Sequence, residues 1–159
     1  MSDKKSSLAK APASQDKKWK REISGGGVVY KKEHGKIFIL LIKPSGQTAN
    51  KDEVWTFPKG HLDDQKPEEA ALREVKEETG VVAKIAGKLG SIKYTFVWEG
   101  DNIFKIVTFY LMEYVSGDTK NHDFEVADAE WFNIHEVENK ISYKTDKEIF
   151  AKAKAILMK

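Results

Sequence analysis

The chain has 159 residues, of which 40% are hydrophobic and 11% aromatic, and this suits a single domain with a substantial core. It contains no cysteine, which excludes disulfides, thiolate metal sites and a cysteine nucleophile. No apolar run approaches the roughly 18–20 residues that a membrane-spanning helix needs, and the N-terminus lacks an apolar signal core. We therefore expect a soluble, cytoplasmic protein without membrane contact.

The net charge of +2 hides a strong asymmetry along the chain. Residues 1–21 carry seven Lys or Arg against two Asp, whereas residues 22–159 carry 20 basic and 23 acidic side chains. The leading segment is rich in Lys, Ser and Ala, a composition typical of a disordered tail. Such tails are most often only solvated, although the charge also suits RNA or polyphosphate. We expect the folded domain to span residues 22–159.

Strand and helix patterns alternate after this tail. Residues 23–31 predict a glycine-rich strand and residues 36–43 a continuous apolar strand, joined by a hairpin turn. The later expected elements are a loop at 43–52, a short apolar stretch at 54–57, a helix at 67–79, strands at 88–97 and 103–113 around a turn, a short strand at 129–132, a helical turn at 134–140 and an amphipathic helix at 144–158. Strands interleaved with helices indicate an α/β fold, in which helices cover a mixed sheet.

The glycine run at residues 25–27 is followed by a strand rather than a helix, and it does not match the GxGxxG dinucleotide motif. It predicts close backbone packing, or a strand that another group must approach. The four histidines show no zinc-ligand spacing, and no GxSxG nucleophile motif is present.

Residues 73–80, REVKEETG, place three carboxylates on one face of the helix at 67–79, because Glu74, Glu77 and Glu78 follow i, i+3, i+4 spacing. Pro67 suits the first helical position and Gly80 the C-terminal stop. Like charges at this spacing destabilise an isolated helix, so the cluster indicates either a solvated acidic stripe or a site that gathers a cation. Oxygen ligands favour Mg²⁺, Mn²⁺ or Ca²⁺.

Residues 55–81, WTFPKGHLDDQKPEEAALREVKEETGV, resemble the Nudix box and its lead-in. The family pattern is Gly, five residues, Glu, seven residues, then Arg-Glu-apolar-any-Glu-Glu-any-Gly-apolar. The matching positions are Gly60, Arg73, Glu74, Val75, Glu77, Glu78, Gly80 and Val81. Gln65 stands where the family has glutamate, the loop from Gly60 is one residue shorter, and Lys66 is a poor helix cap. Similarity to Nudix domains extends over residues 22–159.

The resemblance implies a Nudix α/β/α sandwich with a mixed sheet, and hydrolysis of a nucleoside diphosphate linked to another moiety. It assigns Mg²⁺ (or Mn²⁺) to Glu74, Glu77 and Glu78, with a carbonyl of Lys59 or Gly60 as a further ligand. Arg73 would organise the loop, with Gln65, Asp63 or Asp64 as its brace. For the base near the metal the candidates are Glu125 and its rival Asp123, against a plain loop carboxylate.

The lead-in WTFPKGH resembles the branch that hydrolyses dinucleoside polyphosphates such as diadenosine tetraphosphate. Lys43, Lys59 and His61 would neutralise the additional phosphates, and Tyr94 would stack a base unless it belongs to the core. The alternatives are an oxidised-nucleotide triphosphate pyrophosphohydrolase, an RNA 5′-end pyrophosphohydrolase, and a catalytically weak module that binds nucleotides. The oligomeric state is left open.

Overall fold

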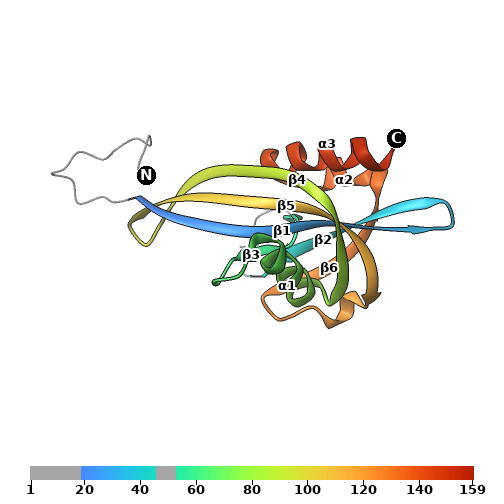
Figure 1. Ribbon diagram of the computed structural model, residues 1–159, viewed down its shortest axis with the longest axis horizontal. Helices are drawn as coiled ribbons and strands as arrows, with labels where there is room; N and C mark the ends of the chain where they lie inside the picture. Colours follow the sequence, from blue (N-terminus) through green and yellow to red (C-terminus); the bar gives the residue numbers. More distant parts are fainter. Residues whose placement is uncertain (1–18, 46–52) are drawn as a thin grey trace.

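The computed structural model describes residues 19–45 and 53–159, which form a six-stranded mixed sheet with helices on both faces (Figure 1). The main path of the sheet runs β4-β5-β1-β2-β6, and β3 pairs with β1. The strands are β1 (Trp19–Glu33), β2 (Lys36–Pro44), β3 (Lys59–His61), β4 (Val81–Trp98), β5 (Asp101–Gly117) and β6 (Val126–Asn133). The helices are α1 (Pro67–Thr79), α2 (Ile134–Lys140) and α3 (Lys144–Leu157), with the 3-10 turn η1 (Thr119–Asn121) before β6.

The sheet is mixed because β1 runs parallel to β5, whereas the other strand pairs are antiparallel. The parallel pairing begins at Trp19, which lies opposite Asn102, and Lys20 Nζ is 2.7 Å from Asp101 Oδ2. Residues 19–21 therefore belong to the sheet and not to the predicted tail. The other residues assigned to that tail, 1–18, lie outside the described residues.

The two faces of the sheet carry separate hydrophobic clusters. Val75 of α1 is buried against β1 and β5, and Phe150 of α3 is buried with β1, β4 and β5 on the opposite side. The glycine run allows α1 to approach β1 closely: a Cβ at Gly25 would lie 2.6 Å from the carbonyl oxygen of Pro67, and one at Gly27 2.9 Å from Val75 Cγ2. This confirms the prediction of close backbone packing, and it fixes α1 over the centre of the sheet.

The predicted helices and strands are all present. β1, β5 and β6 are each longer than predicted, and three further differences follow. β3 was not predicted, because three residues are too few for a periodic signal. β4 begins at Val81 rather than at residue 88, since its register shifts interrupt the alternation of side chains near Gly87 and Gly90. The expected loop at 43–52 begins only after Pro44, and its residues 46–52 lie outside the described chain. The predicted α/β sandwich is confirmed.

No helix within residues 19–45 and 53–159 combines the length and the apolar character needed to cross a membrane.

Candidate active site

Helix α1 ends and begins as its sequence predicts. Gly80 adopts φ +78°, and its N–H donates to the carbonyl oxygen of Lys76 at 2.8 Å. At the other end the side chain of Lys66 cannot accept a capping hydrogen bond, but Glu69 Oε1 accepts from the N–H of Lys66 at 3.2 Å. These termini fix which side chains α1 directs towards β3.

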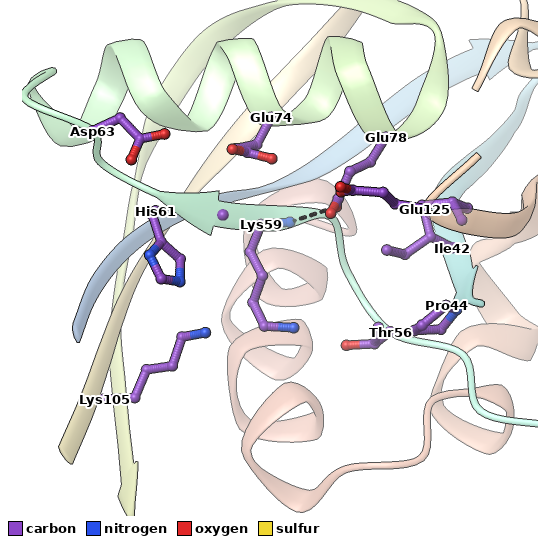
Figure 2. A pocket seen from close by; sticks show the side chains of 12 residues that line it. Ile42, Pro44, Thr56, Lys59, His61, Asp63, Glu74, Glu78, Lys105 and Glu125 are labelled. Carbon is purple, nitrogen blue, oxygen red and sulfur yellow. Dashed lines mark hydrogen bonds between the residues drawn. The ribbon is translucent and has the colours of Figure 1, made fainter. Parts of the chain in front are cut away.

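A cavity of about 500 Å³ opens between α1, β3 and the end of β2 (Figure 2). Its acidic lining comes from Asp63, Glu74, Glu78 and Glu125, and its basic lining from Lys59, His61 and Lys105. The remaining lining residues are Ile42, Pro44, Thr56, Gly60 and Val126. A concave site with convergent charges of both signs suits a ligand that carries phosphates together with a cation.

Glu78 is the most strongly perturbed carboxylate in this cavity. Burial raises its pKa to about 8, with contributions from the negative charges of Glu74 and Asp123, whereas a hydrogen bond from the Lys59 backbone N–H at 3.0 Å acts in the opposite direction. A buried carboxylate beside a second one is stabilised in its charged form by a nearby cation. The oxygen donors and their mutual repulsion thus fit a hard divalent ion.

Glu74 can pack against β3 because the strand has a glycine, Gly60, at the point of contact. A Cβ at Gly60 would overlap the carboxylate group of Glu74, so only glycine leaves this space. Arg73 Nη1 donates to Glu74 Oε2 at 2.8 Å, and the Glu74 side chain is 13% exposed. Burial raises the pKa of Glu74, opposed first by the charge of Arg73.

Arg73 also holds the loop between β3 and α1. Its Nε donates to Gln65 Oε1 at 2.6 Å and its Nη2 to the carbonyl oxygen of His61 at 2.8 Å, while Asp63 Oδ2 lies 3.5 Å from Nη2. Gln65 therefore braces Arg73 directly in this structure, and the neutral amide oxygen serves as the acceptor. The predicted loop-organising contacts of Arg73 are present.

Glu77 is more exposed than Glu74, although the two carboxylates contact the same nitrogen of Arg73. Glu77 Oε1 is 3.4 Å from Arg73 Nη1, its side chain is 51% exposed, and it does not line the cavity. Within residues 19–45 and 53–159, no three His, Asp or Glu side chains form a metal-binding cluster. The structure thus brings together Glu74 and Glu78 beside Gly60, and the assignment of Glu77 to metal stays a prediction.

Of the two candidate bases, Glu125 lines the cavity and Asp123 does not. Asp123 Oδ1 accepts from the Glu125 N–H at 3.1 Å, and the Asp123 N–H donates to the carbonyl oxygen of Glu77 at 3.1 Å. These bonds tie the segment before β6 to the end of α1. Asp123 thus shapes the turn from which Glu125 reaches the cavity.

The predicted substrate residues divide into two groups. Lys59 and His61 line the cavity, whereas Lys43 and Tyr94 do not. Lys43 Nζ lies 3.4 Å from Glu53 Oε2 and 5.9 Å from the centre of the Trp55 ring, and neither partner lines the cavity. Tyr94 packs against the core cluster on the α3 side of the sheet, so the core alternative describes its position.

Lys105 is a cavity residue that the sequence did not reveal. Its side chain is 14% exposed, its Nζ lies 3.9 Å from Glu22 Oε1, and burial followed by the charge of Lys59 lowers its pKa. Glu22 Oε1 is also 3.7 Å from His61 Nε2. Lys105 sits in a strand pattern far from the motif, and only the parallel β1–β5 pairing brings it here.

Residues 20–153 match the family model of the NUDIX domain. The chain belongs to the Nudix family. It is 32% identical over 130 residues to the putative mutator protein MutT4 of Mycobacterium tuberculosis, covering 80% of this chain and 52% of the relative. It is 29% identical over 114 residues to the asymmetrical bis(5′-nucleosyl)-tetraphosphatase of Caenorhabditis elegans, covering 71% of this chain and 80% of the relative. The chain thus spans about half of the mycobacterial relative.

The structure agrees with this family. A crystal structure of a C. elegans Ap4A hydrolase binary complex superposes with a TM-score of 0.69 at 25% identity, covering 86% of this chain and 98% of that one. The predicted Nudix resemblance and enzyme class, a Nudix hydrolase, are confirmed. Nudix hydrolases generally use a divalent metal such as Mg²⁺ or Mn²⁺.

Proposed function

We propose that this Nudix protein hydrolyses dinucleoside polyphosphates, with diadenosine tetraphosphate as the model substrate. The observation that carries the proposal is the pairing of Glu74 and Glu78 with three basic side chains, Lys59, His61 and Lys105, around one cavity. A chain of four phosphates offers more negative charge than a diphosphate, so additional cations beyond the metal-binding carboxylates suit it. The named activity of the C. elegans relative supports the same substrate class.

Glu74, Glu78 and the carbonyl oxygen of Gly60 would hold Mg²⁺ or Mn²⁺, with Glu77 as a further ligand. When bound, the ion would neutralise phosphate oxygens and lower the pKa of a coordinated water. Arg73 holds the loop through Gln65 and His61, and it holds Glu74 through a third hydrogen bond. Its role is therefore to position other residues of the site.

The reaction adds water to one phosphorus atom while an anhydride P–O bond breaks. Glu125 takes the proton from the attacking water, and the leaving phosphate departs as an anion that Lys59 and Lys105 stabilise. By this route one molecule of diadenosine tetraphosphate and one water would give one ATP and one AMP. The basic residues orient the phosphate chain before the reaction begins.

The test is product analysis of the purified protein with diadenosine tetraphosphate, with Mg²⁺ and with EDTA. We expect ATP and AMP only when the metal is present. Oxidised dGTP and 5′-triphosphorylated RNA are offered in parallel at the same concentration. A higher kcat/KM for either of these overturns the choice of substrate. Absence of turnover on all three also overturns it, and leaves a different nucleoside diphosphate substrate or a binding module.

A nucleoside triphosphate is the second candidate substrate. The match to the 8-oxo-(d)GTP phosphatase of Mycolicibacterium smegmatis supports it, at 31% identity over 96 residues that cover 60% of this chain and 28% of that relative. RNA contact through the basic residues 1–18 is a separate proposal, tested by comparing RNA binding by the full chain with that of a variant in which these lysines are replaced by glutamine.

A further inference from the structure

The hydroxyl of Thr56 is a polar group in the cavity that the reaction does not use. Thr56 lines the cavity together with Ile42 and Lys59, and it is 2% exposed. Its Oγ1 donates a hydrogen bond of 2.5 Å to Oδ2 of Asp146, a residue of α3 that is also 2% exposed. A threonine hydroxyl carries one proton, so this bond leaves only lone pairs on Oγ1 for any ligand.

Asp146 is the acceptor of this hydrogen bond. Burial raises its pKa, and the hydrogen bond from Thr56 and the positive charge of Lys59 both oppose that rise by stabilising the carboxylate. With Asp146 ionised, the direction of the Thr56 hydroxyl is fixed. The cavity therefore presents an acceptor at this point, without a competing donor from the same group.

The apolar part of the cavity lies beside this acceptor. Ile42 and Val126 are 4% and 3% exposed, and together with Pro44 they form the wall next to Thr56. Figure 2 shows Thr56 and Pro44 well away from the Glu74 end of α1, with the Lys59 side chain between the two regions. A nucleotide whose phosphates contact Lys59 could thus lay its base on the apolar wall, with the edge of the base towards Thr56.

We propose that Thr56 is a base-specificity residue, which accepts a hydrogen bond from an exocyclic amino group of the substrate's nucleobase, and that Asp146 is the positioning residue that fixes its hydroxyl. This inference rests on the proposed function, because it assigns the base of the same nucleotide substrate. It selects adenine or guanine over the corresponding bases that lack an amino group.

The experiment compares two pairs of nucleotides that differ by one amino group: adenine against unsubstituted purine, and guanine against hypoxanthine. For each pair we measure kcat/KM of the dinucleoside tetraphosphate with Mg²⁺ and, separately, Kd of the nucleoside monophosphate by calorimetry. The wild-type protein is expected to prefer the amino-bearing member of at least one pair by roughly tenfold or more, the scale for a lost buried hydrogen bond. No discrimination within either pair overturns the proposal.

Thr56→Val keeps the shape of the side chain and removes the hydroxyl. We therefore expect the preference for the amino-bearing nucleotide to disappear, with a ratio of about one within each pair. Thr56→Ser restores the hydroxyl and should recover the preference. Thr108→Val is the matched control, because it removes a hydroxyl that bonds Ser91 and does not line the cavity. A preference that persists in Thr56→Val refutes the role of Thr56.

Asp146→Asn tests the positioning role. The amide N–H₂ can donate to Thr56 Oγ1, which frees the hydroxyl proton to face the cavity, so the amino preference should disappear or invert. An unchanged preference in a folded Asp146→Asn protein refutes this role, and if that variant does not fold, the Val and Ser variants still decide the matter for Thr56. If the wild type hydrolyses no nucleotide, the proposed function has failed, whereas the monophosphate affinities still test the base contact.

Discussion

Arg73 donates from Nε to Oε1 of Gln65 at 2.6 Å, so the residue that departs from the Nudix pattern still contacts the arginine. The bond ties the end of the β3–α1 loop to the helix that carries Glu74. A carboxylate at this position would add charge to an existing contact and would not need a new geometry. In the shortened loop, the neutral amide of Gln65 thus makes the contact that braces Arg73.

The first prediction concerns this brace. Gln65→Glu should give kcat/KM equal to or higher than that of the wild type, because the charged acceptor strengthens the bond to Arg73. Gln65→Ala should lower kcat/KM by about tenfold or more, as expected when a residue supporting a metal ligand is lost. Steady-state kinetics on diadenosine tetraphosphate measure both. A sharp loss in Gln65→Glu would show that this loop has no room for a carboxylate.

The second prediction concerns the fit of Gly60 to Glu74. A methyl group at position 60 would overlap the Glu74 carboxylate, so Gly60→Ala should displace that side chain and lower kcat by about 100-fold, the scale for a misplacement of about 1 Å. Gly87→Ala is the matched control, because its Cβ would meet nothing within 4 Å. Kinetics and thermal unfolding of the two variants are compared. Equal activity of Gly60→Ala and wild type would show that the position of Glu74 does not matter for the reaction.

The third prediction separates the carboxylates of α1. Glu78 lines the cavity and Glu77 contacts Arg73, yet the family pattern assigns both to the metal. We expect Glu78→Gln and Glu77→Gln each to lower kcat by orders of magnitude with the fold intact, since binding of metal and substrate would draw Glu77 from its exposed position. Glu69→Gln on the same helix is the control, because Glu69 only caps the helix end. Full activity in Glu77→Gln would restrict the metal ligands to Glu74 and Glu78.

The sequence predicted α1 to the residue, because Pro67 and Gly80 mark its ends by backbone chemistry that acts locally. It also pointed to Glu74, Glu78, Lys59 and His61, which all belong to one motif and its lead-in. Lys105 and Glu22 could not be found in this way, since they meet only through the pairing of β1 with β5. The residue pattern of a strand predicts the strand itself, but it does not say with which distant strand it pairs. Tyr94 and Lys43 do not line the cavity, and their assignment to the substrate stays a prediction, because residue type alone does not say towards which surface a side chain points.

The fourth prediction follows from the position of Lys105. Lys105→Met keeps the length of the buried side chain and removes its charge, so kcat/KM for diadenosine tetraphosphate should fall by roughly tenfold to 100-fold, the range for a lost charge-assisted contact. The loss should be smaller for a dinucleoside diphosphate, which places fewer phosphates near the cations. Lys93→Met removes an exposed lysine on the neighbouring strand and serves as the control. An equal loss for both substrates would show that Lys105 acts on the fold and not on the phosphate chain.

The fifth prediction concerns the stability of the metal-free protein as a function of pH. The pKa of Glu78 is about 8 in the folded protein, against an ordinary value of 4.5 for the unfolded chain. Between these values the folded state retains a proton that the unfolded state has released. The free energy of unfolding should therefore decrease as the pH rises from about 5 to about 8. Glu78→Gln, which carries no titrating carboxyl group at this position, should flatten that slope.

Mg²⁺ should reverse this trend, because a bound cation stabilises the ionised carboxylate and competes with the proton. The rise in Tm on adding Mg²⁺ should then be larger at pH 8.5 than at pH 5.5, and it should be small at both values in Glu78→Gln. Thermal unfolding followed by circular dichroism, with and without Mg²⁺ at each pH, measures the four values for each protein. A Mg²⁺-induced rise of the same size at both pH values would mean that the proton on Glu78 and the metal do not compete, and Glu78 would then be a buried acid outside the metal site.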